Sequence, residues 1–117
     1  MKYRTIVADP PWDFRWNGTG QWPGARRTGA KGLGYSTMGL SAILALPVAS
    51  LAQDDAALFL WVPAGLNREG VGCAVARAWG FEPSGEFIWS KGLRLGGGFP
   101  RVCHEVVLVC PSRGLRG

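Results

Sequence analysis

The feature that most constrains the fold is a short apolar run that stops at two consecutive prolines. Residues Thr5 to Ala8 are β-branched or small and apolar, a composition typical of a buried strand. After Asp9, Pro10 and Pro11 supply no backbone N–H, so the hydrogen-bond ladder of the strand must end there. A following proline also holds Asp9 in extended geometry. The sequence therefore predicts a strand with a carboxylate fixed just beyond its last residue.

Three later segments have the composition of strands: Ala56–Val62, Glu86–Ser90 and Glu105–Cys110. The first is apolar at every position, which predicts a strand covered on both faces.

Two segments between the predicted strands have helical spacing of apolar residues, Leu40–Ala52 and Leu66–Trp79. Ser41 is the expected N-cap of the first, and Pro47 is expected to end or kink it. Gly80 follows the second, where a C-terminal cap is wanted. Such alternation predicts a single α/β domain over residues 1–117 with a mostly parallel sheet. Ligands of these sheets bind beyond the carboxyl ends of the strands, which is where Asp9 lies.

Charge is unevenly distributed along the chain. The net charge is +5, with six bases against two acids in residues 1–31 and five against one in residues 91–117. One basic face is the electrostatic footprint of a nucleic-acid binder. Because no apolar run approaches the roughly 18 residues of a membrane span, we expect a cytoplasmic protein without a membrane partner. The cysteines show no ligand spacing, although Cys103, His104 and Cys110 are candidates on paper, so we expect no metal.

The tetrapeptide Asp9-Pro10-Pro11-Trp12 suits one particular reaction. An aromatic amine attacks a methyl donor poorly unless its lone pair is localised, and two acceptors on its two N–H bonds would do this. Asp9 offers a carboxylate, and the carbonyl of Pro10 is expected to stay free because the ladder has ended. Trp12 is expected to stack on the base, a contact worth about 1–3 kcal/mol. The alternative is a rigid turn with the indole filling the core.

A long glycine-rich stretch, residues 13–34, follows this motif and has six glycines. It combines stacking faces with bases, including Arg15 and Trp16, and suits a target base swung out of its strand. A structureless connection is the alternative. The second glycine-rich segment, Leu95–Phe99, lacks the register of a nucleotide-binding loop, and we expect a loop that carries Arg101 near the active edge.

Seven segments occur in an order that resembles the N(6)-adenine methyltransferase family, which includes mRNA adenosine methylases and phage and bacterial DNA methylases. They are Ile6–Trp12, Tyr35–Met38, Leu44–Val48, Leu58–Val62, Trp79–Phe81, Trp89–Lys91 and His104–Glu105. The resemblance implies a Rossmann-like methyltransferase fold, S-adenosyl-L-methionine as methyl donor, and adenine in DNA or RNA as substrate. Of the two nucleic acids, we expect DNA as the partner. Asp9, Pro10, Pro11 and Trp12 match the catalytic signature.

The resemblance also implies roles for single residues. Asp9, Lys91 and Glu105 would contact the methyl donor, and Tyr35 matches a substrate-loop tyrosine. The family's later cofactor-binding segment has no counterpart here, so we expect a partial domain, truncated at its C-terminus. Two explanations stay open: either the chain is a fragment or truncated product, or self-association or a partner completes the sheet. Two other functions stay open: a catalytically inactive nucleic-acid-binding relative, and methylation of the cytosine amine.

Overall fold

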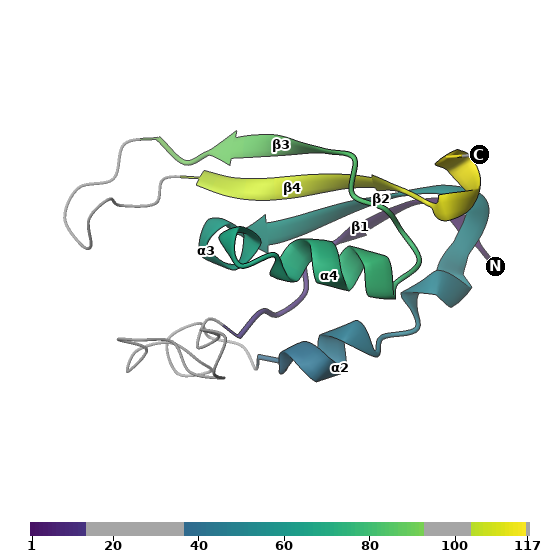
Figure 1. Cartoon of the computed structure of the whole chain (residues 1–117), viewed down its shortest axis with the longest axis horizontal. Helices are drawn as coiled ribbons and strands as arrows, with labels where there is room; N and C mark the ends of the chain where they lie inside the picture. Colours follow the sequence, from purple (N-terminus) through teal and green to yellow (C-terminus); the bar gives the residue numbers. More distant parts are fainter. Residues whose placement is uncertain (14–36, 93–103, 117) are drawn as a thin grey trace.

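A computed structural model describes residues 1–13, 37–92 and 104–116 of the chain. Four strands and their helices form one α/β unit (Figure 1). The strands are β1 (Tyr3–Ala8), β2 (Ala52–Pro63), β3 (Gly85–Ser90) and β4 (His104–Pro111). All four predicted strands are confirmed, and each extends beyond its predicted bounds. The largest extension is in β2, which begins at Ala52 because Ala52 pairs with Tyr3 of β1.

The helices are shorter than predicted, and each break has a local cause. The first predicted helix is α2 (Leu40–Leu44) followed by a 3₁₀ turn, η2 (Val48–Leu51), with Pro47 between them. Gly39 stands at the N-cap of α2, so the prediction of Ser41 as the cap is wrong: Ser41 lies inside the first turn.

The second predicted helix is also two helices, α3 (Ala64–Arg68) and α4 (Val71–Ala78). Gly70 lies between them with φ +79°, a left-handed conformation that glycine adopts without strain. Gly80 has φ +91° just beyond α4, as predicted. Residues Arg113–Arg116 form a final 3₁₀ turn, η3. Within the three described ranges, none of these helices has the length and apolar character to cross a membrane.

The sheet is mixed, so the prediction of a mostly parallel sheet is wrong. Its order is β1-β2-β4-β3; β1 and β2 are parallel, whereas β4 runs antiparallel to both of its neighbours. Helices lie between β1 and β2 and between β2 and β3 in the chain, as crossovers require. The sequence between β3 and β4 has no helical pattern, and an antiparallel neighbour needs none.

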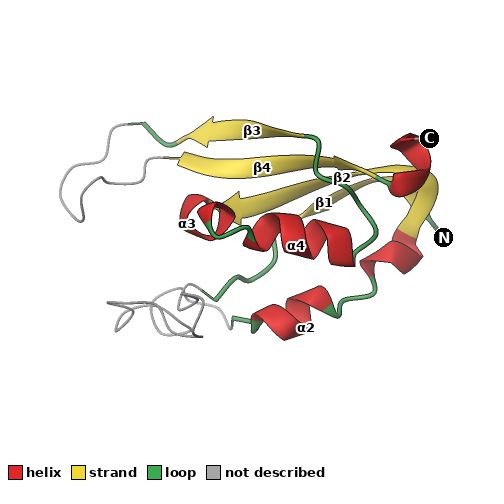
Figure 2. Cartoon of the chain, in the orientation of Figure 1, coloured by secondary structure: helices red, strands yellow, loops and turns green. Residues whose placement is uncertain are grey.

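The helices gather on one side of the sheet, where the core lies (Figure 2). From β2, Leu58, Leu60 and Val62 point into this core and are almost completely buried. Gly72 lets α4 approach the sheet closely, because a Cβ there would lie only 2.7 Å from Cγ2 of Val62 and 2.9 Å from Cδ1 of Leu108. The helical layer therefore packs tightly on this face.

Among the described residues nothing covers the opposite face of the sheet, and β2 is fully buried on one face alone, so the prediction that β2 is covered on both sides is wrong. Burial alternates along β2, and Phe59 and Trp61 are only partly buried. On the same face the side chains of Val7, Phe87 and Trp89 are 67%, 61% and 59% exposed. The apolar sequence of β2 could not show that one face is only partly buried, because the sequence of a strand does not say which elements pack on each of its faces.

Candidate active site

Three charged residues meet at the end of the sheet where β1 stops. Asp9 follows the last residue of β1, Lys91 follows β3, and Glu105 is the second residue of β4. Because β4 runs antiparallel to β3, its beginning lies at the carboxyl end of β3, and Ser90 is the register partner of His104. The structure thus brings together Asp9, Lys91 and Glu105, the three residues predicted to contact the methyl donor.

Lys91 and Glu105 form an ion pair at this edge. Their Nζ and Oε2 atoms are 3.6 Å apart, and the two side chains are 37% and 36% exposed. An exposed pair of this length contributes only about 0–1 kcal/mol. The pair can therefore open to other partners at little cost.

Asp9 lies close enough to Glu105 to be affected by its charge. Partial burial of its carboxyl raises the pKa of Asp9 above the ordinary aspartate value, and the negative charge of Glu105 raises it further. The residue nevertheless remains open to solvent. Neighbouring residues of an extended chain point to opposite faces of a sheet. Ala8 packs against the core, which leaves Asp9 on the face that carries Glu105.

A tight turn follows Asp9. The backbone N–H of Trp12 donates to the carbonyl oxygen of Pro10 at 2.8 Å, so the prediction that this oxygen stays free is wrong. The prolines end the hydrogen-bond ladder as expected, but the next backbone N–H in the chain, that of Trp12, donates to an oxygen of the motif itself. A carbonyl oxygen has two lone pairs, and this bond uses one.

Trp12 is part of the core. Its side chain is 3% exposed, and its indole Nε1–H donates to the carbonyl oxygen of Trp61 at 2.9 Å. Its backbone pairs with Met38, whose N–H donates to the carbonyl of Pro11 at 2.9 Å. In this arrangement the indole anchors the turn to β2, which is the alternative role that the sequence left open, and stacking on a base stays a prediction.

A cavity of about 420 Å³ lies on the helical side of the motif, and the sequence did not predict it. Its lining is mostly apolar and comes from the motif, from α2 and from the start of α3 and α4: Trp12, Asp13, Met38, Gly39, Leu40, Ser41, Ile43, Leu44, Leu66 and Val71. Asp9 does not line this cavity, because its carboxylate lies on the other side of the sheet from the Trp12 indole.

The remaining predicted site residues, Arg15, Trp16, Tyr35 and Arg101, lie outside the described residues. Among the described residues, no cluster of three or more histidine, cysteine, aspartate or glutamate side chains could hold a metal ion. Burial, and then the nearby Cys73 and Glu82, raise the pKa of Cys110 to about 12, which keeps it a neutral thiol of the core.

Comparison with known proteins identifies the class. The MT-A70 family model matches residues 3–97, which include the motif, β1, β2 and β3. An N(6)-adenosine-methyltransferase MT-A70-like protein of Drosophila melanogaster is 34% identical over 90 residues, 77% of this chain and 12% of the relative. The type II methyltransferase M.MunI of a Mycoplasma species is 30% identical over 121 residues, 92% of this chain and 50% of the relative.

The α/β fold, the carboxylate beyond β1 and these matches define a protein of the N(6)-adenine methyltransferase class. Within that class, the chain belongs to the MT-A70 family. It spans half the length of M.MunI and a much smaller share of the Drosophila protein.

Proposed function

We propose that this chain transfers a methyl group from S-adenosyl-L-methionine to the exocyclic amine of adenine in DNA or RNA, with DNA as the first substrate to test. The observation that carries the proposal is the gathering of Asp9, Lys91 and Glu105 at the carboxyl end of β1. This edge is where α/β sheets bind their ligands. The basic ends of the sequence supply the charge that a nucleic-acid substrate requires.

Asp9 acts on the amine. Its carboxylate accepts a hydrogen bond from one N–H of adenine and so aims the nitrogen lone pair. Partial burial and the charge of Glu105 make this carboxylate more basic than an ordinary aspartate, which strengthens the hydrogen bond it accepts. Holding the amine in attack geometry is the larger effect, because orientation alone can remove roughly 7–11 kcal/mol of barrier.

The charges beside Asp9 fit the methyl donor. S-adenosyl-L-methionine supplies an electrophilic methyl group on sulfur and carries an ammonium and a carboxylate at its amino-acid end. Asp9 and Glu105 match the ammonium, and Lys91 matches the carboxylate. Because the Lys91–Glu105 pair is weak and its side chains are about one-third exposed, each member can take a ligand group as its new partner.

The rest of the motif is proposed to position Asp9. The turn bond to Pro10 and the indole bond to Trp61 tie the segment after Asp9 to β2. Side chains that act in catalysis need such support, since small displacements are costly to the rate.

A second candidate is a catalytically inactive nucleic-acid-binding relative. One lone pair of the Pro10 carbonyl oxygen is taken by the Trp12 N–H, and the Trp12 side chain is buried, which favours a structural role for this half of the motif. Such a relative would bind DNA or RNA with a steep salt dependence and would give no heat of binding with S-adenosyl-L-methionine.

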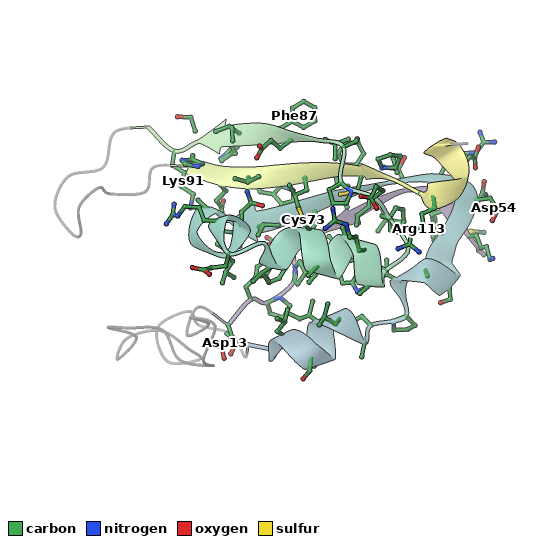
Figure 3. All side chains as sticks on the ribbon, in the orientation of Figure 1. Asp13, Asp54, Cys73, Phe87, Lys91 and Arg113 are labelled. Carbon is green, nitrogen blue, oxygen red and sulfur yellow. The ribbon has the colours of Figure 1, made fainter. Side chains whose placement is uncertain are left out.

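The test is transfer of labelled methyl from S-adenosyl-L-methionine to adenine-containing DNA and, in parallel, RNA. Asp9→Asn removes the charge, and Asp54→Asn is the matched control, because Asp54 is an exposed strand aspartate at the opposite end of the sheet from Lys91 (Figure 3). We expect Asp9→Asn to lose about 100-fold in rate, the scale of one electrostatic contact in a transition state. Asp54→Asn should keep the activity.

Equal incorporation by wild type and Asp9→Asn would refute the role of Asp9. Absence of incorporation by the wild type, together with salt-dependent binding and no heat with the donor, would select the inactive relative.

A further inference from the structure

The end of the sheet beyond β1 carries more negative than positive charge. Among the described residues on the face of Glu105, two carboxylates, those of Asp9 and Glu105, lie near one ammonium, that of Lys91. We call these three residues the charged edge. Nζ of Lys91 is 3.6 Å from Oε2 of Glu105, so the lysine offsets one carboxylate. With all three groups ionised, the charged edge has one negative charge in excess.

Strand pairing places these side chains on one face. Glu105 is the register partner of Trp89, and such partners share a face of the sheet. Lys91 follows Ser90, the last residue of β3, and its ion pair with Glu105 puts it on the same face. The charge of Glu105 also reaches Asp9, because it adds to the effect of partial burial in raising the pKa of that carboxyl. A cation close to both carboxylates would therefore relieve a repulsion within the folded chain.

Water screens these charges less than it screens charges in bulk solution. Trp89 stands directly beside Glu105 on β3, and its ring meets that of Trp61 edge-on, with centroids 5.9 Å apart. The Glu105 side chain is 36% exposed. Apolar rings beside a partly covered carboxylate lower the local dielectric, so a charge near Glu105 interacts with it more strongly than in water.

Methyl transfer changes the charge of the donor by one unit. S-adenosyl-L-methionine carries a sulfonium, an ammonium and a carboxylate, which leaves one net positive charge. Transfer breaks the bond between sulfur and the methyl carbon, and the electron pair of that bond stays on sulfur. A new bond joins the methyl carbon to the adenine nitrogen, which releases a proton to solvent. The product, S-adenosyl-L-homocysteine, has the same amino-acid end but a neutral sulfur.

We propose that Glu105, together with Asp9, makes the charged edge select the sulfonium donor over its thioether product; this rests on the proposed function and adds a specificity-determining role for Glu105. The excess negative charge of the edge is offset by the donor and is left unopposed by the product. The same difference favours release of the product, because the attraction to sulfur ends when the methyl group has left.

The size of the effect follows from the length of the ligand. A carboxylate that binds the donor's ammonium stands roughly 7 Å from the donor's sulfur, given a normal hydrogen bond and the carbon chain between the two groups. Two unit charges at roughly this separation change a binding constant by roughly 3- to 60-fold, from full water screening to the screening at a protein surface. Since Glu105 is partly exposed, we expect the lower part of this range.

The test is calorimetry of the chain with S-adenosyl-L-methionine, with S-adenosyl-L-homocysteine and with sinefungin, which carries a protonated amine in place of the sulfonium. We expect the donor and sinefungin to bind at least about fivefold more tightly than the product, and high salt to reduce this preference. Glu105→Gln should lower the preference about threefold, whatever it does to the shared ammonium contact. Glu86→Gln is the matched control, because Glu86 is an exposed glutamate near the other end of β3 and should leave the preference unchanged.

The outcomes separate this role of Glu105 from methyl transfer itself. Equal affinities for donor and product, or a preference that Glu105→Gln leaves intact, would overturn the role and leave methyl transfer standing. A preference that sinefungin does not share, or that salt does not reduce, would assign it to contacts with the methyl group and would also overturn the role. Both of these comparisons use the wild type, so they decide even if the variant fails to fold. No heat with any of the three ligands would overturn the proposed function and this role with it.

Discussion

Replacing Trp12 by phenylalanine separates the two roles that the motif allows for its aromatic residue. In the structure the indole is 3% exposed and its N–H donates to the carbonyl of Trp61. Phenylalanine cannot make this bond, which costs about 0.5–1.5 kcal/mol, and the loss of roughly two buried carbons adds about 1.5 kcal/mol. The free energy of unfolding should therefore fall by about 2–3 kcal/mol. Trp89→Phe is the control, because Trp89 is 59% exposed and should change stability by less than about 0.5 kcal/mol.

The assay is urea denaturation without substrate or methyl donor, followed by circular dichroism. A base-stacking residue held ready at the surface would give Trp12→Phe the same small effect as Trp89→Phe. Equal midpoints for the two variants would thus refute the core role and restore the stacking prediction. A loss of about 2–3 kcal/mol confined to Trp12→Phe would instead establish the indole as the anchor of the turn.

Three further predictions concern stability and charge. Gly72→Ala should destabilise the fold by about 0–2 kcal/mol in denaturant titrations. The clash with Val62 and Leu108 costs about 1–3 kcal/mol, and alanine regains about 1 kcal/mol of helix propensity. Clear stabilisation would contradict the close approach of α4 to the sheet. Glu105→Gln should lower the pKa of Asp9 toward its ordinary value, though not fully, since burial is the larger cause, and carboxyl NMR titration measures the shift. Because the pKa of Asp9 is higher in the folded than in the unfolded chain, ionised Asp9 opposes folding. Asp9→Asn should therefore stabilise the fold at neutral pH, and this gain should disappear as the pH falls through the raised pKa toward 3.8. Thermal unfolding midpoints across that pH range measure the effect, and a lower midpoint for Asp9→Asn at neutral pH would contradict it.

The strands and the place of the motif could be predicted because their signals are local. Pro10 and Pro11 end β1 in any tertiary context, because they lack a backbone N–H. The apolar runs of β2 and β4 are short and continuous, which is typical of buried strands. Helix lengths were predicted less well. A glycine can lie inside a helix or between two helices, and only the structure shows that Gly70 has a left-handed φ of +79° and separates α3 from α4.

The positions of three candidate site residues could be predicted in part, and their roles stay predictions. Position after a strand end correctly placed Asp9 and Lys91 at one edge of the sheet, and family resemblance added Glu105. The state of the Pro10 carbonyl was missed, because a bond from the N–H two residues later depends on how the turn closes and not on which donors the prolines remove.

By itself, the sequence determined where the strands run and that a carboxylate stands beyond the first of them. Those properties follow from backbone donors, side-chain shape and periodicity, which act within a few residues. Tertiary structure decided the direction of β4, the burial of Trp12 and the partial exposure of Phe59 and Trp61. Each of these depends on a partner far away in the chain, because pairing and burial are fixed by what packs against a segment and not by the segment's own residues.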